Sequence, residues 1–357
     1  MKSSGPWQHN PWYSILRVYV DYTTRFSYRR CKVEGKENIP SNAAVIIAPN
    51  HCNTLMDAMV VLRTFPGPIV FGARADIFEN RTVAKIMRFL RILPMVRRRD
   101  GIRKVLRNYD TMDQVVDVLS NGVPFCMFAE GAHRPKHSLM PLSKGIFRIA
   151  VSADQALDGK RDVYIVPAGL EYGDYFHYRS WSRVRYGRPV NVSQYVREHP
   201  DLSDPEKYNA LRELLAPAVR SQFVWFPDDE EYDARWNAFE TRFEALNGCK
   251  PSESGLPKSR VARILLAILT FPFFLLSAVI TAPMWGLAEF LCHKKVRDHA
   301  FRNTVRFGVK LIVTILLGII YAVLLFIFLP WWIALLGLLY FIISYSIVYD
   351  WLNLVRK

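Results

Sequence analysis

Two long uncharged apolar runs near the carboxyl end most constrain the folds that are open to this chain of 357 residues. Residues 264–288 contain no charged side chain, and neither do the 39 residues of 311–349. A helix of about 20 apolar residues spans the hydrocarbon core of a bilayer, so both runs predict membrane helices rather than buried helices of a soluble protein. Pro330 divides the second run into residues 311–329 and 331–349, which predicts a helical hairpin. We therefore expect a membrane domain over residues 260–357.

Basic residues on both sides of the first run predict its orientation. Three precede it and six fill the connection to the second run; they are Lys258, Arg260, Arg263, Lys294, Lys295, Arg297, Arg302, Arg306 and Lys310. Such residues concentrate on the cytoplasmic side of a membrane. Residues 264–288 would then enter and leave by one face, a re-entrant path that Pro272 and Pro283 favour, and a single crossing is the alternative. We expect an integral membrane protein that faces the cytoplasm and that lies in the inner (cell) membrane if the protein is bacterial.

Residues 1–30 predict an amphipathic helix at the membrane surface. Trp12, Ile15 and Tyr19 recur at helical spacing, with several arginines nearby. Arg17 interrupts the apolar stretch, which therefore lacks the continuous core of a secretory signal. The alternative is an ordinary helix that packs its apolar side on the core.

Residues 31–246 predict an α/β domain with a helix-covered, mostly parallel sheet. Short runs rich in branched residues alternate with helical periods. The predicted strands are residues 44–49, 69–73, 93–96, 124–129, 163–170 and 184–190, and the predicted helices are residues 83–90, 105–119, 144–157, 208–223 and 232–246. Residues 247–259, with Pro, Ser and Gly, predict a linker to the membrane domain.

Charge and cysteine content narrow the class of partner. The net charge of +15 at pH 7 predicts an anionic partner. Beside long apolar runs, anionic membrane lipid is favoured over nucleic acid. The five cysteines share no metal or disulfide spacing and predict a reducing compartment. We expect no metal site, because Pro135 disfavours the helix that would bring His133 and His137 to one face.

A first polar cluster follows the predicted strand at residues 44–49. Ligands of such sheets bind where strands end, and His51 lies at this point. A helix that begins near Asn53 or Thr54 would place Asp57 in its first turn, within reach of the imidazole. A carboxylate on one ring nitrogen fixes the tautomer and leaves the other nitrogen as a general base. His51 and Asp57 are therefore the predicted catalytic residues.

Two further clusters follow other predicted strands. Three consecutive arginines after residues 93–96 offer bidentate sites for phosphate or carboxylate. After residues 124–129, Glu130 can accept hydrogen bonds and Gly131 lets the backbone approach a ligand. The predicted substrate-binding residues are Arg97, Arg99, Glu130, Gly131, His133, Arg134 and Lys144. Each cluster alone also fits an ordinary surface loop, but their shared position after strands favours one site.

The sequence also lacks several familiar motifs. It contains no Gly-Xaa-Ser-Xaa-Gly elbow, no Walker phosphate loop and no Gly-Xaa-Gly-Xaa-Xaa-Gly motif. A site with a base and no nucleophile of its own would activate a hydroxyl group of a substrate.

These motifs resemble those of the membrane-bound glycerolipid acyltransferases, which include glycerol-3-phosphate and lysophosphatidic acid acyltransferases. The segment from His51 to Asp57 is similar to their His-Asp motif, residues 94–101 to their arginine motif, and residues 128–131 to their Phe-Pro-Glu-Gly motif. Val166-Pro167 and residues 33–40 are similar to the last block and the lead-in, so the resemblance covers about residues 28–190.

The sequence departs from the family pattern at three places. Five residues rather than the usual four separate His51 from Asp57. Ala129 replaces the usual proline, and Ala132-His133-Arg134 replaces the usual Thr-Arg pair.

The resemblance implies acyl transfer from a thioester. His51 would deprotonate an acceptor hydroxyl, which attacks acyl-CoA or acyl carrier protein, and Asp57 would orient His51. Arg97, with Arg99 as the weaker candidate, would hold an acceptor phosphate, while Glu130 with Gly131 would position the glycerol portion. The donor is a co-substrate, and no cofactor is implied.

Lysophosphatidic acid is the expected acceptor, in phospholipid biosynthesis. Glycerol-3-phosphate is an alternative acceptor, as is an amino-acid lipid or another non-phosphate lipid. A membrane scaffold with a degenerate site is the alternative outside enzymes.

Overall fold

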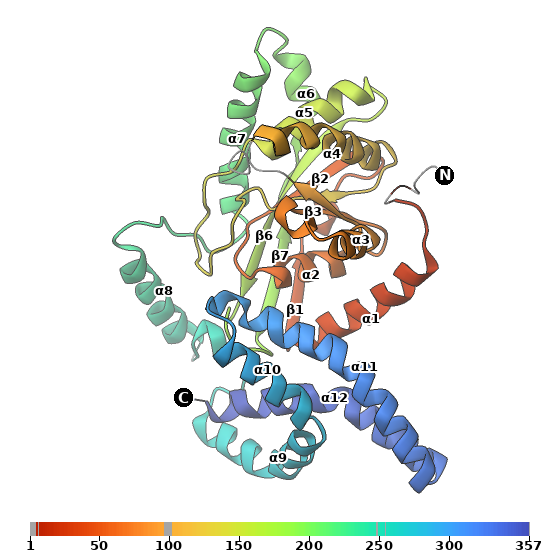
Figure 1. The fold of residues 1–357 in the computed structure, drawn as a ribbon. Coiled ribbons are helices and arrows are strands. Elements are labelled where there is room, and N and C mark those ends of the chain that lie inside the picture. Colours follow the sequence, from red (N-terminus) through yellow and green to blue (C-terminus); the bar gives the residue numbers. More distant parts are fainter. Residues whose placement is uncertain (1–4, 6, 96–101, 248, 254, 357) are drawn as a thin grey trace.

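The computed structural model describes residues 5, 7–95, 102–247, 249–253 and 255–356, and for residues 102–110 it describes only the course of the helix. A sheet lies between layers of helices, and α9 to α12 lie together below this layered part (Figure 1). The strands are β1 (Arg30–Glu34), β2 (Ala44–Pro49), β3 (Val70–Arg74), β4 (Ile92–Met95), β5 (Phe125–Cys126), β6 (Val163–Tyr172), β7 (Trp181–Tyr186) and β8 (Val190–Asn191). The α-helices are α1 (Pro11–Ser27), α2 (Leu55–Thr64), α3 (Arg81–Phe89), α4 (Ile102–Ser120), α5 (Gly145–Leu157), α6 (Val192–Glu198), α7 (Asp204–Arg220), α8 (Tyr232–Asn247), α9 (Arg260–Ile280), α10 (Ala282–Lys294), α11 (Arg302–Phe328) and α12 (Trp331–Val355).

The sheet is mostly parallel, as the sequence predicts. Its strand order is β1-β7-β6-β2-β5-β3-β4, with β8 paired to β6. The pairs from β6 through β2, β5 and β3 to β4 are all parallel, so the carboxyl ends of these strands share one edge. On the other side, β7 runs antiparallel to β6, and β1 runs parallel to β7.

Strand β2 shows how the sequence builds the centre of the sheet. All six of its residues are buried. Ala44 and Ile46 pack in the cluster that contains side chains of α4, α5 and α7, whereas Val45 and Ile47 pack in the cluster that contains side chains of α2. A central parallel strand is covered on both faces and is therefore a continuous apolar run.

The predicted strand ends differ from the observed ones in two places. The predicted strand at residues 124–129 pairs only over Phe125–Cys126, and a turn at residues 129–130 leads into the loop that carries the candidate site. The predicted strand at residues 184–190 is divided into Trp181–Tyr186 and Val190–Asn191. Gly187 and Pro189 separate the two pieces, and both residue types weaken strand pairing.

Strand β1 and helix α6 have no counterpart among the predicted elements. The sequence of β1, Arg-Cys-Lys-Val-Glu, is largely polar because this strand forms the edge of the sheet and its side chains are half-buried or exposed. Helix α6 has seven residues, too few to show an apolar period.

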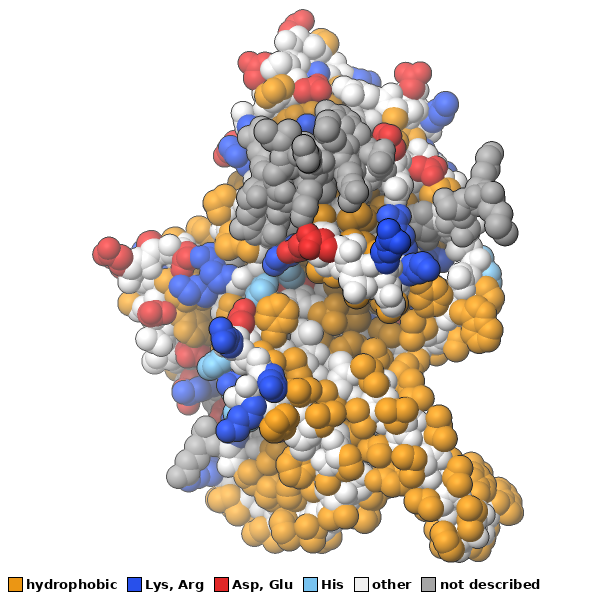
Figure 2. Space-filling view, viewed as in Figure 1, with side chains coloured by type: hydrophobic (Ala, Val, Ile, Leu, Met, Phe, Trp, Pro, Cys, Tyr) orange, Lys and Arg blue, Asp and Glu red, His pale blue; other side chains and the backbone are white. Residues whose placement is uncertain are grey.

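Three of the described helical segments are long and apolar enough to cross a membrane: Arg260–Ile280, His299–Phe328 and Trp331–Val355. Hydrophobic side chains cover the surface that these helices present, whereas most charged side chains on the same view lie above them (Figure 2). The uncharged run at residues 264–288 is divided between α9 and α10, with Pro283 in the first turn of α10, where a missing N–H is tolerated. Its path through a bilayer stays a prediction.

Helix α1 turns apolar side chains outward. Trp12, Ile15 and Val18 are between 65% and 72% exposed, whereas Thr23 and Thr24 are buried. The helix packs against α2, α11 and α12 (Figure 1). Contact of this outer face with a membrane surface stays a prediction.

Candidate active site

His51 and Asp57 lie at the carboxyl end of β2, in the loop and first turn that lead into α2. Nδ1 of His51 is 2.8 Å from Oδ2 of Asp57. The five intervening residues, one more than the usual number, therefore still allow the pair to form. A carboxylate accepts the hydrogen of Nδ1, so Nε2 is left as the basic nitrogen of the ring.

Asp57 is fully buried, and both of its carboxylate oxygens accept hydrogen bonds. Oδ2 accepts the backbone N–H groups of Cys52 at 2.8 Å and Asn53 at 2.7 Å. Oδ1 accepts the hydroxyl of Tyr172, at the end of β6, at 2.7 Å. A buried carboxylate without such donors would cost several kcal/mol. The loop is therefore folded around this side chain, and the orientation of His51 depends on it.

Thr54, at the start of α2, has φ +49° and ψ −126°. A β-branched residue at positive φ is strained and needs support from its surroundings. Thr54 is 5% exposed, and its hydroxyl lies 2.5 Å from the hydroxyl of Thr304 in α11. A strained turn, held from outside by a membrane helix, thus precedes Asp57.

Glu130 connects the His51 loop to the loop after β5. Its Oε1 accepts the backbone N–H of His51 at 2.6 Å, and its Oε2 accepts the backbone N–H of Met140 at 2.7 Å. Burial raises the pKa of Glu130 to about 7, although both backbone hydrogen bonds favour the ionised form. Both oxygens are engaged with the backbone, so Glu130 supports the position of His51. Its contact with a glycerol group stays a prediction.

Phe128 and Gly131 shape the surroundings of His51. The ring of Phe128 stacks on His51 with centroids 4.3 Å apart. Gly131 has φ +68°, a conformation that L side chains rarely adopt. Among the described residues, apart from Gly131 and its two chain neighbours, no heavy atom lies within 4 Å of the position that a Cβ would take. The backbone conformation, rather than lack of space, selects glycine at this position.

His133 lies edge-on to His51, with ring centroids 5.7 Å apart. Its Nε2 is 3.2 Å from Oδ2 of Asp298, which directly precedes the short helix η5 (His299–Phe301). The ring of Phe301 contacts the ring of His133 edge-on, with ring centroids 5.0 Å apart. The sequence departs at His133 from the pattern that it otherwise resembles, and the structure places this residue next to the His51–Asp57 pair.

Arg134 bonds to the loop of His51, whereas Lys144 is exposed to solvent. The backbone N–H of Arg134 donates to the carbonyl of His51 at 3.0 Å, and its guanidinium pairs with Asp228. Lys144 is exposed at the start of α5. A substrate contact for either residue stays a prediction.

Arg97 and Arg99 lie outside the described residues. Strand β4, which ends at Met95, stops at the same edge of the sheet as β2. This is the edge at which the sequence places the arginine motif.

Cys52 is the nearest thiol to the catalytic pair. It is 2% exposed, and burial raises the pKa of its thiol well above the ordinary value, with the charge of Asp57 adding to the rise. Only a thiolate is an effective nucleophile. Cys52 therefore stays protonated and packs in the core.

Sequence reasoning missed Tyr172 and Asp298. Tyr172 is the last residue of β6, a mainly apolar strand that runs beside β2, and a hydroxyl group at that position is a usable signal. Asp298 is the single acidic residue of the sequence between 290 and 349. An acidic residue within a strongly basic connection indicates a specific partner.

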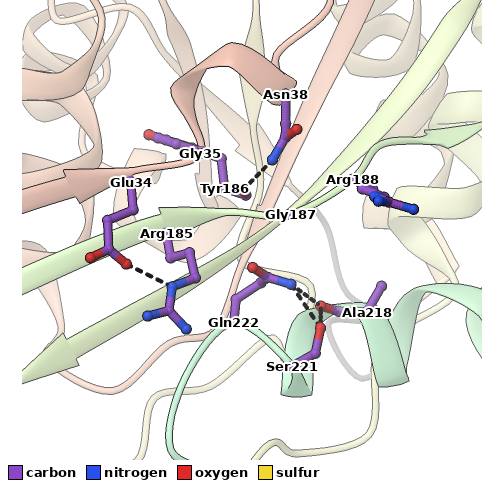
Figure 3. A pocket seen from close by; sticks show the side chains of 10 residues that line it. All are labelled: Glu34, Gly35, Asn38, Arg185, Tyr186, Gly187, Arg188, Ala218, Ser221 and Gln222. Atoms are coloured by element: carbon purple, nitrogen blue, oxygen red, sulfur yellow. Dashed lines mark hydrogen bonds and ion pairs between the residues drawn. The ribbon is translucent and has the colours of Figure 1, made fainter.

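An open pocket of about 440 Å³ lies beside β1, β7 and the end of α7 (Figure 3). An ion pair between Glu34 and Arg185 at 2.8 Å closes one side of it. The lining residues are Glu34, Gly35, Asn38, Arg185, Tyr186, Gly187, Arg188, Ala218, Ser221 and Gln222. This set includes none of the predicted site residues, so the pocket is separate from the site at the end of β2.

Residues 30–171 match the family model described as Acyltransferase. Over 126 residues, or 35% of its length, the chain is 27% identical to glycerol-3-phosphate O-acyltransferase 2 of Saccharomyces cerevisiae, and this match covers 16% of the yeast protein. The crystal structure of the 1-acyl-sn-glycerophosphate (LPA) acyltransferase of Thermotoga maritima is similar with a TM-score of 0.41 and 20% sequence identity, over 58% of this chain and 78% of that chain.

Proposed function

We propose that the protein transfers a fatty acyl group from a thioester to a hydroxyl group of lysophosphatidic acid, and the match of residues 30–171 to the family model described as Acyltransferase supports this proposal. The acyl donor in this proposal is acyl-CoA or acyl carrier protein. The product is a membrane phospholipid precursor with a second acyl chain.

The proposed step needs one base and no protein nucleophile. Nε2 of His51 takes the proton of the acceptor hydroxyl while that oxygen attacks the thioester carbonyl. The C–O bond forms, the C–S bond breaks, and the proton passes from His51 to the departing thiolate. Asp57 holds the ring in one tautomer and stabilises the imidazolium between the two proton transfers.

One observation carries this proposal: His51 Nδ1 lies 2.8 Å from a carboxylate that is fully buried and held by two backbone N–H groups and a tyrosine hydroxyl. Burying a carboxylate in this way is expensive, and an ordinary loop histidine does not require it. The arrangement supports a general base that keeps one orientation.

The position of the membrane helices supports a lipid acceptor. Thr304, in the first turn of the apolar helix α11, contacts Thr54 beside the catalytic pair. A lysophospholipid that diffuses in the bilayer would reach the site along this helix. The basic connection between α10 and α11 suits an anionic headgroup and, in this proposal, faces the cytoplasm.

Glycerol-3-phosphate is the second candidate acceptor, because the yeast relative is named for its transfer to that molecule. Both candidates present a hydroxyl group on a glycerol phosphate, so the same residues serve either reaction. The acceptors differ in whether an acyl chain is already present.

Acyl transfer in membranes carrying wild type or His51→Ala tests the proposal. Each membrane preparation is offered lysophosphatidic acid or glycerol-3-phosphate together with acyl-CoA or acyl carrier protein as donor. Wild type should form product with lysophosphatidic acid, and His51→Ala should lose roughly 10²–10⁴ of the rate at equal protein content. Product from glycerol-3-phosphate alone would identify the second candidate, and near wild-type rates in His51→Ala would reject the base.

Arg97→Ala separates phosphate from non-phosphate acceptors. If Arg97 holds the phosphate, the acceptor KM should rise roughly tenfold or more while the donor KM stays constant. An unchanged acceptor KM would favour an amino-acid lipid or another acceptor without phosphate. Absence of product with every pair would favour the scaffold.

A further inference from the structure

The segment at the start of α11 contacts three loops of the candidate active site. We define this α11 entry segment as residues 298–306. Its Thr304 contacts the loop after β2, its Asp298 contacts the loop after β5, and its Asn303 donates to the carbonyl of Tyr175 at 2.7 Å in the loop after β6. Figure 1 shows the start of α11 directly below the sheet. A membrane helix therefore forms part of the wall of the site.

Within this wall, Asp298 and His133 make a second histidine-carboxylate pair beside the first. The distance from Nε2 of His133 to Oδ2 of Asp298 is 3.2 Å, and the other oxygen, Oδ1, accepts the backbone N–H of Ala300 at 2.9 Å. Phe301 contacts the His133 ring edge-on at 89°. These contacts hold His133 in one orientation against His51.

We propose that Asp298 is a positioning residue of the reaction, which orients His133 so that Nδ1 of His133, for which the described residues provide no partner, contacts the acceptor lipid beside the hydroxyl that His51 deprotonates. This inference rests on the proposed acyl transfer and extends it to a residue of the membrane part. The substrate contact belongs to His133, and Asp298 acts through it.

The geometry assigns this contact to the acceptor rather than to the acyl donor's carrier. The acceptor hydroxyl must reach the basic nitrogen of His51, because deprotonation requires hydrogen-bond distance. The ring of His133 lies 5.7 Å from that of His51, so it borders the place of the reacting hydroxyl. Hydrogen bonding by Asp298 occupies Nε2 of His133 and leaves Nδ1 for the acceptor.

A simple structural role for Asp298 can be separated from the proposed one. Asp298 caps the short helix η5 through Oδ1, and serine is also a good capping residue. Asp298→Ser keeps a capping oxygen but is too short to contact His133. Asp298→Asn keeps one acceptor oxygen, which can accept from His133 in place of Oδ2 while the contact with Ala300 is lost. Ser259→Ala removes the cap of α9 and is a matched control, because it weakens the start of another membrane helix away from the site.

The first measurement is steady-state kinetics of these variants in membranes, with His133→Ala and the double variant included. Asp298→Ser and His133→Ala should each raise the acceptor KM roughly tenfold and leave the donor KM unchanged, and the double variant should be no worse than the more impaired single variant. Asp298→Asn should restore most of the loss, and Ser259→Ala should match wild type. An unchanged acceptor KM in Asp298→Ser, losses that multiply in the double variant, or a fall in kcat alone would overturn the inference.

The second measurement is direct binding of lysophosphatidic acid to detergent-solubilised His51→Ala protein, which needs no turnover. Adding Asp298→Ser should weaken binding roughly tenfold. Weaker binding together with a wild type that transfers no acyl group would keep this inference and reject the proposed reaction. Two outcomes would overturn this inference, whether or not acyl transfer is observed. One is equal binding by His51→Ala and by the variant that also carries Asp298→Ser, and the other is no binding by His51→Ala itself.

Discussion

The two histidine-carboxylate pairs beside the site are built in opposite ways. His51 and Asp57 are six positions apart in the chain, 2.8 Å apart in space, and the Asp57 side chain is 0% exposed. His133 and Asp298 are 165 positions apart, their contact is 3.2 Å long, and the Asp298 side chain is 56% exposed. The first pair is fixed by one loop and its buried donors, and the second depends on docking of a membrane helix. The first pair should therefore dominate the chemistry, and the second should tune binding.

The strongest test of this comparison replaces each carboxylate with its amide. Asp57→Asn should lower kcat by roughly 10²–10⁴, because a neutral amide cannot stabilise the imidazolium that forms when His51 takes a proton. Asp298→Asn should retain most of the activity, because its amide oxygen still accepts from His133. Initial rates with saturating acceptor measure both effects. Comparable losses in kcat would show that the exposed pair contributes to the chemical step itself.

Glu130 offers a test of how much the first pair depends on its backbone support. At pH 4.5, Glu130→Gln should lower the free energy of unfolding by about 1–3 kcal/mol, because a carboxyl oxygen can accept from each backbone N–H group, whereas the amide nitrogen cannot accept and leaves one of them unpaired. Thermal unfolding in detergent measures the change. His133→Ala is the comparison. It should lower the free energy of unfolding less than Glu130→Gln, because His133 is held by Asp298, which lies outside the loops after β2 and β5. No loss in Glu130→Gln would show that the support is dispensable.

The pH dependence of stability tests the burial of the same carboxyl group. The pKa of Glu130 rises from 4.5 to about 7 on folding, so its contribution to stability is fully present below pH 4.5 and is lost as the pH rises through about 7. Wild type should therefore lose stability relative to Glu130→Gln between pH 4.5 and about 7. Unfolding temperatures of both proteins in steps across this range measure the difference. A constant difference would contradict the raised pKa.

The smallest expected effect concerns the contact between helix α11 and the loop after β2. Thr304→Val removes the hydroxyl that contacts Thr54 and should cost about 0.5–1.5 kcal/mol of stability, with a smaller change in rate than either amide variant at Asp57 or Glu130. Thr270→Val is a matched control in α9, where the hydroxyl bonds only to its own helix at Leu266. Differential scanning fluorimetry of the two variants compares them. Equal stability of both would remove Thr304 from the support of the site.

The sequence predicted those parts of the fold and site that local patterns determine. The central strand β2 was recognisable because Ala44–Pro49 is a continuous apolar run, and the His51–Asp57 pair because the two residues lie in the loop after that run and in the first turn of the helix that follows. Edge strand β1 was missed because its polar sequence carries no such run. Asp298 was missed because its contact with His133 depends on tertiary docking across 165 positions, which no local spacing encodes. The predicted contributions of Arg97 and Arg99 lie outside the described residues.

The packing of α11 against the α/β part has a consequence for how the protein becomes active during its synthesis. Phe307 of α11 is 1% exposed and belongs to the same buried cluster as Met56 and Val60 of α2. The ribosome completes the sheet and α2 before it makes α11, so the cluster around α2 stays incomplete until the membrane helices have emerged. Thr54 also gains its hydroxyl partner only at that stage. Under the proposed function, completion of the site would therefore follow the synthesis of α11, and acyl transfer would begin only after the membrane helices are made.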